Sequence, residues 1–489
     1  MTALDSPNAP QLRDRALLKS QAYIDDTWTG EPVDPVVNPA SGDELSRVPR
    51  LGKPEAEAAV TAAARAFANW SKRLANERAA QLRRWFELIV EHQDDLAKIL
   101  TLEQGKPISE ARGEIQYAAS FVEFYAEEAR RIRGEILPHH RNDARVLVMR
   151  QPIGVCAAIT PWNFPAAMIT RKCAPALAAG CTVVLKPAPE TPLTALALAE
   201  LAQRAELPRG TLNVVTGDAA AIGGQWCDDP RVRFLGFTGS TAVGKQLMRQ
   251  AAATVKKVAL ELGGNAPFIV FADADLEAAV EGAIAAKFRN MGQTCICANR
   301  IFVHDSIHDA FVQRLAERVG ELVVGNGLDE QTTQGPLITP AAVEKVQALL
   351  QDAVAGGAEI VTGGQPHRLG GTFFEPTVLR NVSGSMEITR QEIFGPVAPV
   401  TRFHSEAEVI TMANDTIYGL AAYFYGRDLG QAFRVAEQLE YGMVGINSTV
   451  LGAATVPFGG VKQSGIGREG SHQGMDEYLE SKYVLVGGL

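Results

Sequence analysis

Apolar and polar positions follow two different rhythms along this chain. Residues 54–133 show helical spacing, which is clearest where alanines and charged residues alternate at 55–70 and 78–100. The residues before about position 50 are rich in turn formers, so we expect loops and short strands there. The chain therefore begins with a loop-rich entry followed by a block of helices.

Short apolar runs alternate with helical segments from residue 154 to residue 261. The runs typical of buried strands lie at 154–160, 181–185, 212–215, 233–237 and 257–261. Helices are expected between them at 166–179, 191–205 and 242–253. Apolar strands separated by helices predict a parallel sheet that is covered on both faces.

A second alternating block follows, from residue 266 to about residue 460. Its strand candidates are 268–271, 301–303 and 359–361, and its helix candidates are 276–290, 308–322 and 341–355. Residues 145–150 and 483–486 also alternate in the manner of strands. We expect these two strands to pair, in one arrangement across subunits, and to serve assembly.

Composition narrows the class of protein. A length of 489 residues fits two or more domains, and 46% hydrophobic with 21% charged residues is typical of a soluble globular chain. The net charge of −9 and the lack of a basic run argue against a nucleic-acid partner. An anionic ligand would have to be held by local cations rather than by the overall field.

Targeting, membrane and metal signals are missing from the sequence. Residues 1–10 lack the basic start and apolar core of a signal peptide, and prolines break the longest apolar stretches, so we expect no membrane span. The six cysteines show neither a disulfide framework nor zinc spacing. We therefore expect a cytoplasmic protein without a metal.

Two segments carry the strongest chemical signal. Cys295 follows a glycine and small polar residues at the end of a predicted helix, and Glu261 stands beside two glycines at the end of a predicted strand. A thiolate attacks carbonyl groups, and a carboxylate can activate water against the resulting thioester. A free cysteine has a pKa of about 8.5, so Cys295 needs help to ionise. Together the two residues predict covalent catalysis through sulfur.

Two strand ends are candidates for binding a dinucleotide. Gly239, Ser240 and Gly244 follow a strand and open a helix, where free N–H groups and the helix dipole favour a pyrophosphate. The alternative is an ordinary helix N-cap. Lys186 ends another strand and faces the expected ligand crevice, where it would bind ribose hydroxyls. The alternative is a solvated lysine at a proline-rich turn.

Three further residues have both a chemical and a structural interpretation. Asn163 follows the first strand of the sheet and offers an amide donor to an oxyanion, or else forms a turn packed by Trp162. Glu392 lies shortly before a Gly-Pro stop and is a ribose ligand or a surface residue. Cys297 is either a small buried filler or a redox partner of Cys295, whose oxidation would stop catalysis.

These motifs together resemble the aldehyde dehydrogenase superfamily, from the segment at 38–44 to the segment at 457–465. The resemblance implies an α/β fold with a Rossmann-type cofactor domain, an α/β catalytic domain and a small β oligomerisation arm. It places the NAD(P)-binding domain at 1–130 and 152–262 and the catalytic domain at 263–463. The arm and C-terminal tail would take 131–151 and 464–489.

The resemblance also assigns roles. Cys295 resembles the nucleophile, Glu261 the general base, and Asn163 the oxyanion donor together with the backbone N–H of Cys295. The expected cofactor is NAD or NADP. The residues that would contact it are Thr160, Pro161, Trp162, Lys186, Pro189, Gly239, Ser240, Gly244, Glu392 and Phe394.

Within the superfamily, the chain is most similar to the succinate-semialdehyde dehydrogenase branch. Arg171 and Arg289 match arginines that hold the substrate carboxylate there, with structural ion pairing as the alternative. The serine that the branch carries just before Pro457 is absent, so glutarate semialdehyde and sulfolactaldehyde are also candidate substrates. Pro189 replaces an acid that repels a 2′-phosphate, which predicts dual use of NAD and NADP.

Assembly and two other functional classes complete the expectations. The resemblance implies a homodimer or homotetramer. A cysteine hydrolase or acyltransferase without nicotinamide is one alternative, although no histidine lies near either motif. A non-catalytic binding protein on the same fold is the other, and the presence of Cys295, Glu261 and Asn163 argues against it.

Overall fold

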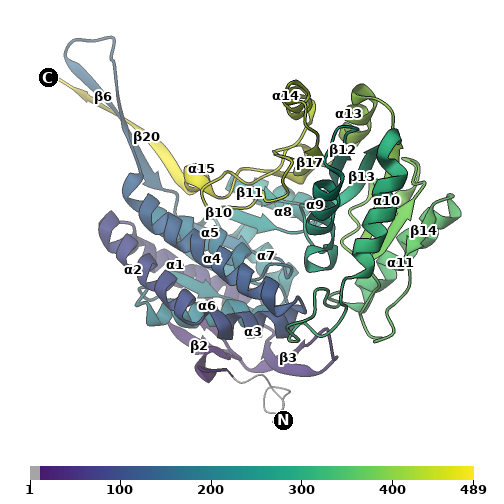
Figure 1. The fold of residues 1–489 in the computed structure, drawn as a ribbon. Helices are drawn as coiled ribbons and strands as arrows, with labels where there is room; N and C mark the ends of the chain where they lie inside the picture. The colour runs from purple at the N-terminus through teal and green to yellow at the C-terminus, as the bar shows by residue number, and fades with distance from the viewer. Residues whose placement is uncertain (1–11) are drawn as a thin grey trace.

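The computed structural model describes residues 12–489, and it arranges them as two large sheets with a narrow arm beside them (Figure 1). Residues 1–11 lie outside the described part, and with them the expectation that the N-terminus is no signal peptide. The α/β class predicted from the sequence is confirmed.

The first sheet has eight strands in the order β19-β11-β10-β7-β8-β9-β1-β2. Strands β7 to β11 are parallel to one another and confirm the predicted alternation, while β1 and β19 join β9 and β11 in antiparallel pairs. Chain order reverses between β7 and β10, which creates the crevice where such sheets bind ligands. The strands are β1 (Ala22–Ile24), β2 (Thr27–Thr29), β7 (Val155–Ile159), β8 (Thr182–Lys186), β9 (Leu212–Val214), β10 (Val232–Thr238), β11 (Lys257–Glu261) and β19 (Gly465–Ile466).

Helices cover both faces of this sheet, as the apolar strands require. Alternate residues of β8 point to opposite sides: Val183 and Leu185 join one core and Val184 joins another. The first core is covered by α2 (Ala75–Glu91), α3 (Gln93–Gln104), α4 (Ile108–Glu128), α5 (Ala167–Ala179) and α6 (Pro192–Arg204). The second is covered by α1 (Lys53–Trp70), α7 (Ala219–Asp228) and α8 (Thr241–Ala251).

The predicted helix at 78–100 is two helices. His92 lies between α2 and α3 with φ −101° and ψ 18°, which interrupts the helical backbone. The apolar spacing continues across this break, so periodicity alone did not locate it.

The second sheet has seven strands in the order β14-β15-β16-β13-β12-β17-β18. They are β12 (Ala266–Val270), β13 (Ala298–His304), β14 (Glu359–Thr362), β15 (Thr377–Arg380), β16 (Val397–Phe403), β17 (Ala421–Tyr425) and β18 (Met443–Ile446). Its helices are α9 (Leu276–Phe288), α10 (Asp305–Gly320), α11 (Pro340–Ala355), α12 (Glu387–Arg390), α13 (Glu406–Asn414) and α14 (Leu429–Gln438). The helix expected at 276–290 ends at Phe288, because Asn290 and Met291 take a positive φ.

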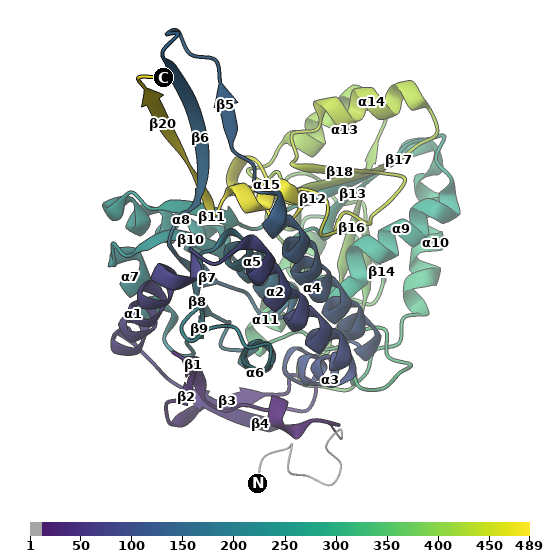
Figure 2. The ribbon, with the colours of Figure 1, turned by 90° about the vertical axis from the view of Figure 1, so that its left-hand side faces the viewer.

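The remaining strands form two small sheets. In the entry segment, β3 (Pro32–Val37) pairs with β4 (Glu44–Pro49), as the turn-rich sequence predicted. The arm consists of β5 (Glu135–Leu137), β6 (Ala144–Pro152) and β20 (Leu479–Gly487), and it projects from the body in both views (Figures 1 and 2). The predicted pairing of the two strands is confirmed, and it occurs within one chain, with Val148 opposite Tyr483.

Three findings bear on the function classes. In the described part of the chain, no helix is long and apolar enough to cross a membrane. All six cysteines are free thiols. Between residues 12 and 489 there is also no group of three or more His, Cys, Asp or Glu side chains that could hold a metal ion.

Candidate active site

Four strands of the first sheet end at one edge, and each carries a residue singled out from the sequence. Thr238 lies opposite Glu261 on neighbouring strands, and Ile159 lies opposite Lys186. Gly239 then bonds back to the Glu261 carbonyl through its backbone N–H, over 3.0 Å. Because these are parallel strands, the edge gathers residues that are far apart in sequence.

Cys295 lies in the segment between α9 and β13 of the second sheet, and it lines a cavity of about 190 Å³. Arg171 from α5 and Arg289, which follows α9, line the same cavity. The structure therefore brings the predicted nucleophile and both predicted anion ligands to one enclosed space. Phe164, Met168 and Phe458 give this space an apolar wall.

The two predicted catalytic groups are in a low-polarity environment. Burial and then the Glu392 carboxylate raise the pKa of the Cys295 thiol to about 12, although Arg171 opposes the rise. Burial, followed by the charge of Glu469, also raises the pKa of Glu261 well above its ordinary value. A carboxyl with a raised pKa is a stronger base once it is ionised. Oε2 of Glu261 has no hydrogen-bond partner among the described residues, so it is free to bind water.

Two glycines permit the close approach of the catalytic segments. A Cβ on Gly264 would lie 2.1 Å from the carbonyl oxygen of Cys295, and one on Gly459 would lie 2.9 Å from Oε1 of Glu261. Contacts under 3.0 Å are not tolerated by real side chains, so both positions require glycine. Gly264 therefore sets how closely the Cys295 segment approaches the end of β11.

Asn163 is buried directly after β7, beside the Cys295 segment. Its Nδ2 donates to the carbonyl oxygen of Gln293 over 3.0 Å. An amide NH₂ has two donors, so one N–H remains for an oxyanion. The turn interpretation is compatible with this role, because Trp162 packs edge-on against Phe394 with ring centroids 5.5 Å apart.

Arg171 is 1% exposed and forms an ion pair with Glu469, over 2.9 Å between Nε and Oε2. The guanidinium lies 4.1 Å above the ring of Phe458. Its Nη2 has no hydrogen-bond partner in the described part of the chain. The structural ion pairing predicted as the alternative is therefore present, and Nη2 is left without a partner among the described residues. Arg289 is exposed and lies 4.9 Å from the centre of the Phe164 ring.

Glu469 is the buried counter-charge of this region. It also bonds to Lys172, whose Nζ donates to Thr238 over 2.6 Å. Burial opposes ionisation of Glu469, but Lys172 and Arg171 outweigh burial and lower the pKa of this carboxyl. Glu469 therefore remains charged, which helps to explain why Glu261 nearby tends to keep its proton.

Three residues predicted to hold a dinucleotide stand at strand ends of the first sheet: Lys186 ends β8, Thr160 follows β7 and Ser240 lies just after β10. Lys186 is buried, not solvated, and burial lowers the pKa of its ammonium to about 8 against the charge of Glu190. Ser240 caps α8 by accepting the N–H of Val243 over 3.4 Å, so the N-cap interpretation is confirmed. Thr160 buries a hydroxyl that has no partner among the described residues.

Four more of the residues predicted to contact the cofactor have defined surroundings. A Cβ on Gly244 would lie 2.3 Å from Leu262, so this glycine lets α8 pack tightly on the sheet. Glu392 accepts the N–H of Gly264 over 3.0 Å, and burial raises the pKa of its carboxyl to about 7. Pro161 is half-buried and Pro189 is exposed.

Cys297 is buried, and its Sγ lies 3.4 Å from the Lys287 carbonyl oxygen. The packing interpretation fits this position. A disulfide to Cys295 would require the segment to turn Cys297 out of the core.

Sequence reasoning missed several residues of the site. The cavity is also lined by Tyr117 and Thr449, whose hydroxyls lie on segments that showed no motif. Glu469 was missed as well, because only the folded chain brings it to Arg171. Glu190 was also missed, although it lies four residues after Lys186 and its charge acts on that ammonium.

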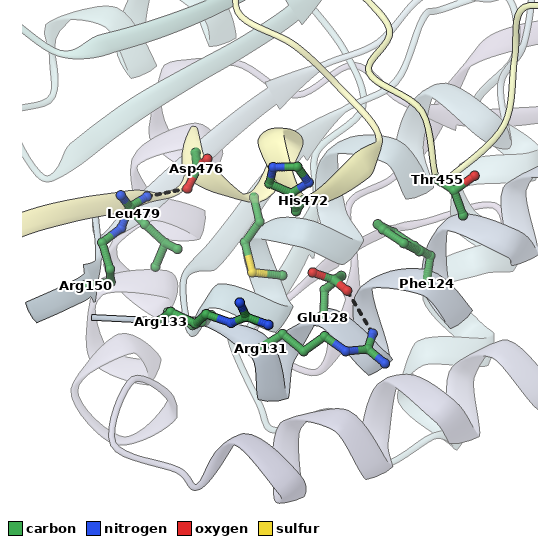
Figure 3. A pocket seen from close by; sticks show the side chains of 11 residues that line it. Phe124, Glu128, Arg131, Arg133, Arg150, Thr455, His472, Asp476 and Leu479 are labelled. Atoms are coloured by element: carbon green, nitrogen blue, oxygen red, sulfur yellow. Dashed lines mark hydrogen bonds and ion pairs between the residues drawn. The ribbon is translucent and has the colours of Figure 1, made fainter. Parts of the chain in front are cut away.

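A larger cavity of about 560 Å³ lies at the base of the arm (Figure 3). There Arg131 pairs with Glu128 over 2.8 Å, and Arg150 pairs with Asp476. None of the residues singled out from the sequence lines it, and its lining includes no cysteine. The smaller cavity at Cys295 is the candidate active site.

Comparison with known families places the chain. Residues 28–484 match the aldehyde dehydrogenase family, and the chain belongs to that family. It is therefore an aldehyde-oxidising enzyme, and the resemblance seen in the sequence is confirmed.

Three relatives and a solved structure are especially similar. A glutarate-semialdehyde dehydrogenase of Pseudomonas aeruginosa is 57% identical, over 98% of this chain and 100% of the relative. An NADP(+) succinate-semialdehyde dehydrogenase of Escherichia coli has the same identity and coverage. A 3-sulfolactaldehyde dehydrogenase of Pseudomonas putida is 56% identical, over 98% and 99%. The crystal structure of an E. coli NADP dependent enzyme is 56% identical with a TM-score of 0.97, over 98% and 100%.

The close contact at Gly264 leads to a first prediction. Gly264→Ala should lower kcat/KM by roughly 100-fold, since a new Cβ displaces the Cys295 segment and small misplacements are that costly. Gly224→Ala is the matched control, because a Cβ at that helical position meets nothing within 4 Å. Steady-state kinetics measure the change in kcat/KM of both variants, and thermal unfolding checks that both are folded. A folded Gly264→Ala enzyme with unchanged kcat/KM would contradict the assignment.

Proposed function

We propose that this enzyme uses NAD or NADP to oxidise a short aldehyde with an anionic tail to the carboxylic acid. Succinate semialdehyde is the first candidate for this substrate. One observation carries the proposal. The cavity that exposes Cys295 also contains the buried guanidinium of Arg171, which has an unpartnered donor, and the cation of Arg289. A buried unpartnered donor is costly, and a bound anion would satisfy it.

The chemistry would proceed through Cys295. Glu261, acting directly or through water, removes the thiol proton, and the thiolate attacks the aldehyde carbon. Asn163 and the backbone N–H of Cys295 stabilise the oxyanion of the thiohemiacetal. An oxidised nicotinamide supplies the hydride acceptor. Glu261 then activates water, which attacks the thioester and releases the acid.

The residues along the crevice support binding of a dinucleotide. Gly239, Ser240 and the N-terminus of α8 would hold the pyrophosphate, and Lys186 and Glu392 would hold the riboses. The unpartnered hydroxyl of Thr160 is a further polar contact. Pro189 neither repels nor binds a 2′-phosphate, so we propose that NAD and NADP are both used. Glu190 interacts with Lys186 and would temper the preference for NADP.

The alternatives for the substrate are glutarate semialdehyde and sulfolactaldehyde, the aldehydes named for two of the relatives. Tyr117 and Thr449, which both carry hydroxyls, line the cavity. They would donate to a larger or differently shaped anion. The cysteine hydrolase is less well supported, because the described residues of this cavity include no histidine to serve as its base.

We also propose the domain division at 1–130 with 152–262, 263–463, and 131–151 with 464–489. We further propose that the chain self-associates through the arm. β20 is an edge strand, and the arm exposes Ile136, Leu137, Met149 and Leu485. Exposed apolar edges of this kind favour contact with another copy of the chain. A dimer or tetramer would cover them.

The proposed mechanism separates the roles of the two catalytic groups. Cys295→Ala should show no turnover. Glu261→Gln should form about one equivalent of reduced cofactor per site before stalling, in a slower burst, because the thiol proton must then pass to solvent. The amide cannot accept a proton from water, and loss of a general base costs roughly 100- to 10,000-fold. Rapid-quench mass spectrometry should show the acyl adduct on Cys295. If the Glu261→Gln enzyme lacks both burst and adduct, the mechanism is wrong.

The proposed anion site predicts a selective loss. Arg289→Met should lower kcat/KM for aldehydes with carboxylate or sulfonate tails by roughly 10- to 100-fold, since a charged hydrogen bond contributes about 1.5–3 kcal/mol. Neutral short aldehydes should be unaffected. The kcat/KM values for the anionic and the neutral aldehydes are measured with both NAD and NADP. Arg390→Met, on a helix outside the cavity, is the control. Equal losses for anionic and neutral aldehydes would refute the role.

Assembly through the arm can be tested by placing charged residues on its exposed apolar edge. Leu485→Asp with Ile136→Asp should shift the enzyme to a smaller species in analytical ultracentrifugation, because charges on an apolar edge oppose burial. Leu369→Asp, at an exposed leucine outside the arm, should not. An unchanged sedimentation coefficient for the arm variant would exclude the arm as the interface.

A further inference from the structure

We propose that the buried Lys106–Glu114 ion pair is a positioning device that holds Asn163 in place for oxyanion stabilisation. Neither residue lines the cavity, and both side chains are completely buried. The inference rests on the proposed function, since it takes Asn163 as the oxyanion donor. It assigns a catalytic consequence to two residues that do not touch the substrate.

Lys106 holds the backbone of the Asn163 loop. Its Nζ donates to the Asn163 carbonyl oxygen over 2.7 Å and lies 3.9 Å from the centre of the neighbouring Phe164 ring. It comes from the turn between α3 and α4, directly after Gly105. The φ of +94° at Gly105 and the N–H bond from Lys106 to Gln104 Oε1 fix that turn.

Glu114 holds the other end of the same loop. Its Oε2 bonds to Lys106 Nζ over 2.5 Å. Its Oε1 accepts the N–H groups of Ala166 and Ala167, over 2.9 and 3.3 Å, at the start of α5. These are N–H groups that a helix leaves unsatisfied at its N-terminus. A single ion pair therefore anchors the loop at Asn163 and again three residues later.

Asn290 joins this loop to the Cys295 segment. Its Nδ2 lies 3.1 Å from the Asn163 carbonyl oxygen, the acceptor that Lys106 also uses. The side-chain amide of Asn163 in turn donates to the backbone carbonyl oxygen of Gln293 over 3.0 Å. The Asn163 amide is thus oriented by the Gln293 carbonyl oxygen, while Lys106 and Asn290 hold the backbone from which that amide projects. Loss of the ammonium would let the loop and amide drift relative to Cys295.

Stability alone is a weak explanation for the pair. A buried ion pair loses hydration of both charges, and apolar replacements of similar volume are often neutral or stabilising. What an apolar pair cannot do is bond simultaneously to a carbonyl oxygen and to a helix N-terminus. The alternative, a purely structural pair, predicts lower stability with unchanged chemistry in the surviving folded enzyme.

The experiment measures acylation separately from binding. In single-turnover stopped flow, Lys106→Met should slow hydride transfer by roughly 10- to 100-fold, since a misplaced catalytic group costs up to that much. The KM of the aldehyde and the Kd of NAD and NADP should change less than about threefold, because no binding contact is removed. The ratio of rates for anionic and neutral aldehydes should not change. Lys106→Arg, which retains the cation, should recover part of the rate.

Two further variants control for folding. Lys106→Met with Glu114→Gln removes both charges, leaves no unpaired buried ion and should show the same slow acylation. Lys256→Met is the matched control, since Lys256 is another buried lysine that bonds to the carbonyl oxygens of Trp226, Asp229 and Val232. It should lower thermal stability and leave the acylation rate unchanged.

A double-mutant cycle with Asn163→Ala decides the inference. If Lys106 acts through Asn163, adding Lys106→Met to Asn163→Ala should slow acylation by less than about threefold further. Losses that multiply would overturn the positioning role, as would normal acylation in a folded Lys106→Met enzyme. A normal rate in Asn163→Ala alone would instead overturn the oxyanion assignment in the proposed function. The two failures are therefore distinguishable.

Discussion

The site depends on a backbone contact between the two large sheets. Glu261 ends a strand of the first sheet, and Cys295 precedes a strand of the second. The Cys295 backbone packs against the segment that follows Glu261, because Gly264 has no side chain to displace it. The connecting segment is firmly held: Ser464 donates to the Gly263 carbonyl oxygen over 2.7 Å, and Arg300 bonds to Asn265. Every other feature of the site is arranged around this contact.

Buried charge is the second constraint. Arg171, Lys172 and Glu469 form one cluster next to Glu261, and Lys106 with Glu114 form another beneath Asn163. The Lys106–Glu114 cluster is neutral, as burial in a low-polarity interior demands, whereas the first cluster has two cations for one carboxylate. Nη2 of Arg171 and Oε2 of Glu261 are among the buried atoms without a hydrogen-bond partner in the described residues. A substrate anion and a water would satisfy them.

Much of the fold was predictable, because strand and helix periods are local properties of the sequence. The apolar strands at 154–160 and 181–185 and the glycines near Glu261 were evident without coordinates. The end of α9 at Phe288 was not, since the positive φ of Asn290 is fixed by contacts to Gln104 and Asn163 far away in sequence. The same holds for Lys106 and Glu469, whose partners are 57 and 297 residues distant. Pattern analysis finds residue types that do chemistry and misses residues that hold them in place.

The two arginines of the cavity are not equivalent, and the difference bears on the breadth of substrates. Arg171 is fixed by Glu469 and by the ring of Phe458, so its free donor points along one direction. Arg289 is exposed, and it has fewer contacts to fix its position. A fixed buried cation selects for charge, because an uncharged tail would leave its donor unpartnered. A solvated, movable cation tolerates differences in length and geometry at little cost. Together they suit a site that requires an anion and accepts carboxylates or sulfonates at slightly different distances from Cys295, in accord with the several anionic aldehydes named among the relatives.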